Sequence, residues 1–105
     1  MTDLIVETSE DGLYTLVELR EGCRLQESFI VSCVELGVVE VRGRAPTEWR
    51  FSNQSRLQLL RAWRLHHDLE LQLAALPLVL ELLDEIGTLR SETELLRLRL
   101  AHWER

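Results

Sequence analysis

Adjacent histidines, two cysteines and a carboxylate pair are the side chains here whose chemistry suits catalysis or metal binding. His66 and His67 are neighbours, so on a helix they point about 100° apart and cannot hold one metal as an i, i+4 pair does. We predict half-buried helical histidines instead. The pair Asp84-Glu85 falls in a segment that reads as a long exposed helix, with no cleft to raise a carboxyl pKa. The five glycines are isolated and form no phosphate loop. We therefore expect no enzyme, no metal site and no cofactor.

The cysteine usage predicts reduced thiols. Cys23 and Cys33 lie ten residues apart, with no further ligand at metal spacing, so a disulfide is the weaker alternative to two partly buried thiols. The N-terminus lacks the pattern of a secretory signal, and no run of about 18 uncharged apolar residues occurs. We expect a cytoplasmic protein that does not enter a membrane.

Length and charge limit the classes of function. The 105 residues, 46% of them hydrophobic, suit one domain or a small domain with a helical appendage, and the leucine-rich composition favours helices. The net charge of -6 argues against non-specific binding of polyanions. All twelve basic residues are arginines, and their surplus is confined to residues 41–70, with six arginines against three acids.

Local signals predict the elements of the first half. A short strand is expected at Leu4–Val6, and Thr15 can N-cap a first helix. A second helix fits Gln26 to Leu36, with Gly37 ending it in the left-handed conformation. Its inner side is predicted to carry Phe29, Ile30, Val34 and Leu36.

A β-hairpin and a third helix should follow. Residues 38–41 alternate as a strand, residues 42–46 form a basic loop, and residues 47–51 return as a second strand with Trp49 and Phe51 on one face. Ser52 then caps a helix that ends near Leu69.

The third helix carries one strongly polar stripe. Apolar residues surround most of it, and the stripe consists of Arg61, Arg64, Asp68 and Gln72. It is either a solvated face with an Arg64–Asp68 ion pair or a charged patch for a partner.

The last helix should begin near Leu73, with Pro77 in or just past its first turn, and it carries a heptad seam. The seam steps by three and four residues through Val79, Leu82, Ile86, Leu89, Thr93, Leu96, Leu100 and Trp103. We favour the interpretation that a second chain covers this seam. The alternative is that the helix folds back on its own domain. Two positions of the heptad, g and e, flank the seam: Glu85 and Glu92 fall at g, and Arg90 and Arg97 fall at e. These charges slightly favour a parallel pair of helices, and the orientation stays open.

This order of elements resembles the MerR-type winged helix, carried by Thr15–Leu19, Val34–Glu40, and Trp49 and Phe51. Three further stretches narrow the resemblance to the chaperone modulator family CbpM: Arg61–Leu69, Leu82–Ile86 and Glu94–Leu100. The implied fold is mainly α, a MerR-like winged helix-turn-helix in residues 1–72 with a small β-hairpin wing, followed by a long C-terminal dimerisation helix in residues 73–105.

The resemblance implies a function as well. Members of this family are cytosolic homodimers that bind the J-domain of the co-chaperone CbpA, stop it from stimulating DnaK and curb its DNA binding. They need no cofactor. We expect the partner contacts on the third helix and the start of the fourth, at Arg61, Arg64, Leu65, Asp68, Leu69, Leu76, Asp84 and Glu85.

Two other functions stay open: a MerR-type DNA-binding transcription regulator, and a bare dimerisation module. A DNA-reading second helix needs basic side chains, whereas this one carries Glu27 and Glu35 and no arginine. We therefore expect no sequence-specific binding of nucleic acid, although Arg42, Arg44 and Arg50 make the wing basic.

Overall fold

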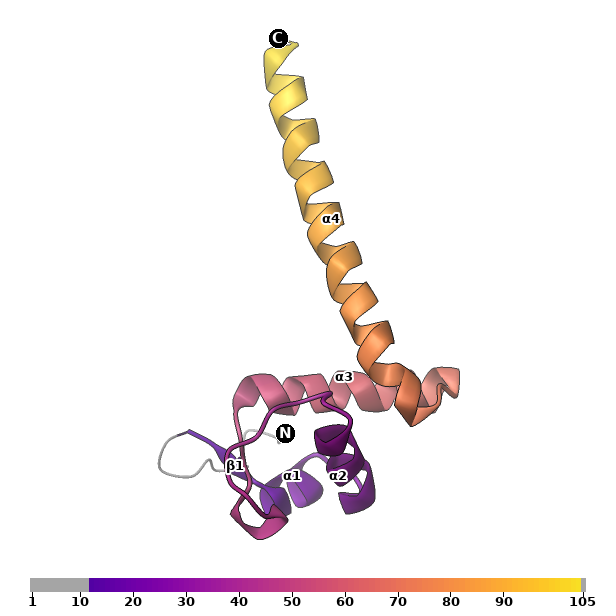
Figure 1. The fold of residues 1–105 in the computed structure, drawn as a ribbon. Helices are drawn as coiled ribbons and strands as arrows, with labels where there is room; N and C mark the ends of the chain where they lie inside the picture. The colour runs from indigo at the N-terminus through magenta and orange to yellow at the C-terminus, as the bar shows by residue number, and fades with distance from the viewer. Residues whose placement is uncertain (1–11, 105) are drawn as a thin grey trace.

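Two short helices, a minimal sheet and two longer helices make up residues 12–104, the part of the chain that this computed structural model describes (Figure 1). Helices α1 and α2 lie on one side of α3, and α4 projects away from all three. The strand expected at Leu4–Val6 lies outside the described residues.

Helix α1 spans Leu16–Gly22 and begins at the predicted cap. The backbone N–H of Glu18 donates to the Thr15 hydroxyl at 3.1 Å, and the Thr15 N–H donates to the Glu18 carboxylate at 2.8 Å. This reciprocal pair satisfies two N–H groups that the first turn would otherwise leave open. The helix stops where Arg24 takes a positive φ of 58°.

Helix α2 spans Glu27–Glu35, with Gln26 and Leu36 at its ends, and Gly37 follows with φ 81° as predicted. Its buried residues are Phe29, Ile30 and Cys33. The expectation for Leu36 was wrong, because this side chain at the helix end is 37% exposed. Cys33 lies one turn after Ile30 and takes the inner position.

The sheet differs from the predicted hairpin. Strand β1, Tyr14–Thr15, pairs antiparallel with β2, Arg50–Phe51. The predicted strand at residues 38–41 is wrong: Val38 and Val39 are both buried, so the segment does not alternate between faces. Only one bridge, between Arg42 and Arg50, closes the wing.

The second predicted strand is also shorter than expected. Pro46 starts a 3₁₀ turn, η2 (Pro46–Glu48), because its fixed φ suits the first position of a turn. Trp49 and Phe51 are both buried and meet edge to face at 6.1 Å between ring centroids, as their spacing predicted. Gly43 fits the wing because an added Cβ would lie 2.5 Å from the Glu48 carbonyl oxygen.

Helix α3 spans Asn53–Leu69, and the Ser55 N–H donates to its cap Ser52 at 3.0 Å. The chain then turns through residues 70–75, which we call the elbow. The elbow begins at Glu70 in the left-handed conformation and ends in a 3₁₀ turn, η3 (Leu73–Ala75). Helix α4 spans Leu76–Trp103, three residues later than predicted, with Pro77 in its first turn as expected.

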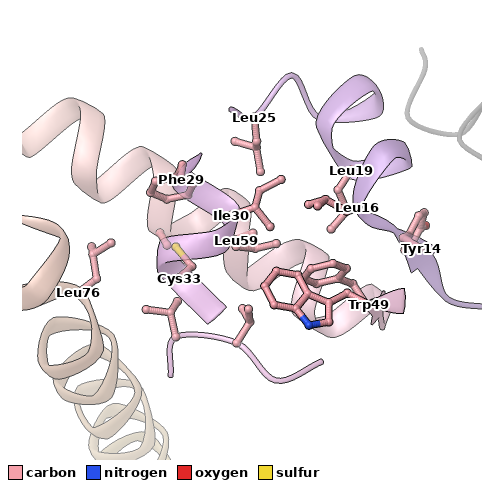
Figure 2. Packing of buried hydrophobic residues seen from close by; sticks show 14 of the residues in the cluster. Tyr14, Leu16, Leu19, Leu25, Phe29, Ile30, Cys33, Trp49, Leu59 and Leu76 are labelled. Carbon is pink, nitrogen blue, oxygen red and sulfur yellow. The ribbon is translucent and has the colours of Figure 1, made fainter. Parts of the chain in front are cut away.

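The core lies between α1, α2 and α3 (Figure 2). Ile30 and Leu59 are at its centre, Tyr14 and Trp49 lie toward the sheet, and Leu76 reaches it from the first turn of α4. The largest fully buried side chains are those of Phe51, Leu19, Ile30, Leu59, Leu76 and Cys33. Burial of a large apolar side chain stabilises the fold by about 1.5–3 kcal/mol. This cluster therefore holds α1, α2 and α3 together, and we call these three helices the helical unit.

Helix α4 contacts the rest of the molecule only near its beginning. Leu76 and Leu80 are buried, whereas every described residue from Asp84 to Glu104 is exposed. The alternative in which the last helix folds back on its own domain is therefore wrong. Among residues 12–104, no helix has the length and apolar character that a membrane crossing requires.

Candidate functional site

One ion pair joins α3 to α4. The Nη1 atom of Arg61 lies 2.9 Å from Oδ1 of Asp84, and the two side chains are 35% and 65% exposed. We call this pair the clamp. An ion pair this exposed stabilises the fold by at most about 1 kcal/mol, so the buried Leu76 and Leu80 contribute more to the packing of α4 on the core.

Exposed acids surround Asp84. Glu85 follows it, and Glu81 lies one turn earlier on α4, and both are exposed. We call Glu81, Asp84 and Glu85 the acidic turn. Glu81 was not among the predicted partner contacts, although its spacing of three from Asp84 places both on one side of the helix.

The stripe on α3 is only partly as predicted. Arg64 and Asp68 are exposed, but the described residues contain no ion pair between them. A base placed four residues before an acid is the weaker order on a helix, which accounts for the missing pair. Gln72 lies in the elbow, beyond the end of α3, and is not part of the stripe.

The three predicted apolar contacts differ in exposure. Leu69 is 62% exposed, and Leu65 is half-buried against the core. Leu76 was wrongly expected at the surface: it is completely buried, because the first turn of α4 packs its apolar side onto the core. Only Leu65 and Leu69 therefore have surface to offer a partner.

An open groove of about 700 Å³ adjoins the clamp. One wall is residues 37–42, the other is α3, and Arg61 and Asp84 also line it. The hydroxyl of Ser55 crosses between the walls and donates to the Glu40 carbonyl at 3.0 Å. The clamp thus borders this groove and shares Asp84 with the acidic turn.

His66 contacts the elbow, and His67 packs on α3 itself. Nδ1 of His66 lies 2.7 Å from the Leu71 carbonyl oxygen, and because a carbonyl only accepts, Nδ1 carries the hydrogen. The half-buried His66 ring stacks on Phe29 at 5.7 Å, and the exposed His67 stacks on Trp63 at 5.4 Å. Cys23 and Cys33 are free thiols, as predicted.

The seam of α4 is exposed along most of its length. Its first residue, Val79, is half-buried beside the helical unit. The exposed fractions of the other apolar seam residues are 51% for Leu82, 43% for Ile86, 55% for Leu89, 62% for Leu96, 60% for Leu100 and 83% for Trp103. An apolar stripe of this length is far larger than isolated surface leucines, and such surfaces mark interfaces.

Known proteins resemble this chain over most of its length. The family model described as MerR HTH family regulatory protein matches residues 14–98, which include the wing, the clamp and most of the seam. A chaperone modulatory protein CbpM from Pseudomonas putida is 39% identical over 94 residues, covering 87% of this chain and 93% of the relative. The chain belongs to the CbpM family.

Other CbpM proteins match at similar coverage. The protein from Pseudomonas entomophila is 37% identical over 94 residues, with 87% of this chain and 93% of the relative covered. An Escherichia coli CbpM is 34% identical over 90 residues, with 86% and 89% covered. The shared name describes a chaperone modulator, a regulatory rather than an enzymatic role.

In this CbpM-family chain, the surface that would face DNA in a MerR-type regulator has mixed charge. Glu27 and Glu35 are exposed on α2, while Arg42 and Arg44 are exposed on the wing. An exposed Arg20 on α1 forms an ion pair with Glu27 at 3.2 Å. Part of the acidic charge on α2 is therefore matched within the molecule.

Proposed function

We propose that this protein modulates a co-chaperone by binding the J-domain of a CbpA-like protein and blocking its stimulation of DnaK. The observation that carries the proposal is the match to chaperone modulatory proteins over 87% of the chain, including both the helical unit and α4. No catalytic step is part of this function, and the protein acts by occupying its partner's surface.

The charge of the clamp region supports this partner. J-domains similar to that of DnaJ carry a basic helix beside a His-Pro-Asp loop, and the acidic turn presents three exposed carboxylates to such a helix. Leu65 and Leu69 supply apolar surface on α3, and Arg64 and Asp68 add charge around it. A polar rim around an apolar centre is typical of specific interfaces.

The functional unit is a homodimer joined through the seam of α4, with residues 1–72 as the winged-helix domain and residues 73–105 as the dimerisation helix. Exposure of seven of the eight seam residues supports this assembly, since water would otherwise cover a long apolar stripe. Because the proposed J-domain partner works beside DnaK, we propose that the protein acts in the cytoplasm.

Calorimetric titration with the isolated J-domain of a CbpA-like co-chaperone tests the proposal. The unmodified protein should bind, and the association rate should fall as salt rises, because the attraction is between unlike charges. Asp84→Lys reverses a central charge and should weaken binding by about tenfold or more. The absence of heat with the unmodified protein at high J-domain concentration would overturn the function.

Glu94→Lys is the matched control for Asp84→Lys. Glu94 is an exposed acid on α4 that lies outside the acidic turn, the clamp and the seam, so its reversal changes the net charge by the same amount. We expect a distinctly smaller loss of affinity for Glu94→Lys. Equal losses in the two variants would show that the net charge of the protein, and not the acidic turn, determines affinity, and would overturn this surface assignment.

A DNA-binding regulator is the competing function, and the exposed arginines of the wing favour it. Selection from a random DNA library at physiological salt separates the two. We expect no reproducible palindromic site, because Glu27 and Glu35 repel phosphates where a reading helix must approach. Weak binding confined to low salt is the ordinary behaviour of exposed arginines.

A further inference from the structure

The clamp occupies the same carboxylate that the proposed function offers to a partner. We propose that Arg61 is an internal competitor of the J-domain: the clamp opens when a basic side chain of the partner binds Asp84, so Arg61 lowers the affinity for the partner. This inference rests on the proposed function, because it takes the acidic turn as the docking site, and it adds the residue that regulates this site.

Asp84 differs from its two acidic neighbours in already having a cation. Among residues 12–104, Nη1 of Arg61 lies 2.9 Å from Oδ1 of Asp84, whereas Glu81 and Glu85 form no ion pair. Oδ2 of Asp84 accepts no hydrogen bond from the described part of the chain, so a partner cation can approach there first. Two cations on one carboxylate repel each other, and this repulsion favours the release of Arg61.

The clamp can open without undocking α4. Its two side chains are 35% and 65% exposed, so water screens their attraction and replaces their hydrogen bond readily. The first turns of α4 are held by Leu76 and Leu80, which are buried in the core and do not depend on the ion pair. Opening therefore changes the charge that the surface presents and leaves the backbone of the docking site in place.

The groove beside the clamp gives the released side chain a place to go. Arg61 lines this open groove of about 700 Å³, in which the guanidinium remains hydrated after it leaves Asp84. The exposed Glu40 on the opposite wall offers a second carboxylate in the same groove. Release of Arg61 therefore buries no unpaired charge, and the clamp reduces binding of the partner without blocking it.

The charges of the acidic turn favour the exchange. Glu81 lies three residues before Asp84 and four before Glu85, and like charges at these spacings on a helix repel each other. Arg61 offsets one of the three negative charges. A basic helix of a J-domain carries several cations and can offset all three, so the partner gains more from the acidic turn than Arg61 does.

Calorimetric titration of Arg61→Gln with the isolated J-domain of a CbpA-like co-chaperone tests the competition. At physiological salt we expect the variant to bind about twofold to fivefold more tightly than the unmodified protein, because an exposed ion pair contributes up to that factor. Arg61→Lys keeps a cation at this position and should bind like the unmodified protein. Weaker binding by Arg61→Gln would show that Arg61 itself contacts the partner and would overturn the proposal.

Arg42→Gln is the matched control, because it changes the net charge by the same amount. Arg42 is exposed, lines the same groove and forms no ion pair within the described residues. Its loss strengthens only the long-range attraction, which is screened beyond about 8 Å at physiological salt. Equal gains for Arg61→Gln and Arg42→Gln would contradict the competition.

A double-mutant cycle isolates the ion pair. In an Asp84→Asn background the clamp is absent, so Arg61→Gln should there raise the affinity no more than Arg42→Gln does. An undiminished gain from Arg61→Gln in that background would also overturn the proposal, because the effect would not pass through Asp84.

Nuclear magnetic resonance of 15N-labelled protein gives a readout that does not depend on affinity. On saturation with unlabelled J-domain, the Nε–H resonance of Arg61 should move toward its position in the free Asp84→Asn variant, where the clamp is open. A resonance that stays at its free position while the J-domain is bound would overturn the inference alone. Absence of binding by the unmodified protein would overturn the proposed function itself.

Discussion

Cys33 is the most deeply buried reactive side chain among the described residues. Burial in the apolar core raises its pKa to about 12, because the thiolate is poorly solvated there. Since the thiolate is the nucleophile, iodoacetamide at about pH 8 should modify the half-buried Cys23 and leave Cys33 intact. Mass spectrometry counts the adducts, and both cysteines should react in urea. Equal rates in the folded protein would contradict the burial.

The raised pKa of Cys33 makes the free energy of unfolding depend on pH. The ordinary pKa of the Cys33 thiol is 9.0, so the unfolded chain loses this proton above pH 9 while the folded chain keeps it to about pH 12. The folded state binds more protons in that window, and the free energy of unfolding falls as pH rises through it. Cys33→Ala should remove this part of the slope when urea denaturation is compared at pH 8 and pH 10.

At the scale of elements, His66 links α3 to the elbow through its hydrogen bond to Leu71 and its stack on Phe29. His66→Ala should lower the free energy of unfolding by about 1–2 kcal/mol, because it removes a partly buried hydrogen bond and an aromatic contact. Urea denaturation measures the change.

His67→Ala is the matched control, since His67 is exposed and its ring stacks on Trp63 of the same helix. Its effect should stay within about 0.5 kcal/mol, as is usual for a surface substitution. If the two variants lose the same stability, the elbow does not depend on His66.

Helix ends were predictable from the sequence because their signals are local. Thr15, Ser52, Gly37 and Pro77 each act within a few residues, and all four have the predicted role. The strand at residues 38–41 was not predictable in the same way, because a strand needs a partner from elsewhere. Here β2 ends at Phe51, so in the register of the Arg42–Arg50 bridge residues 39 and 40 extend past the end of β2.

In the candidate site, too, local features were predictable from the sequence and long-range contacts were not. Arg61 and Asp84 were each chosen from the sequence, but their contact spans 23 residues and depends on how the elbow folds. The burial of Leu76 follows from the same long-range packing. Periodicity on one helix cannot predict either feature, because both depend on where a second helix lies.

At the scale of the whole molecule, the seam determines the assembly state. The double variant Ile86→Asp/Leu89→Asp should be monomeric by light scattering, because each aspartate would bury an unpaired charge in the interface. Leu98→Asp is the control, because Leu98 is also apolar and is 59% exposed but is not a residue of the seam. We expect the control to remain dimeric. A dimer in the double variant would exclude the seam as the interface.

The short attachment of α4 makes it a lever arm. From Leu76 as the pivot, Asp84 lies roughly 12 Å along the helix and Trp103 roughly 40 Å along it, at 1.5 Å per residue. A rigid rotation that moves Asp84 therefore moves Trp103 about three times as far, and a turn of about 10° displaces the tip by about 7 Å. Small adjustments of the clamp are thus amplified into large displacements at the far end of the helix.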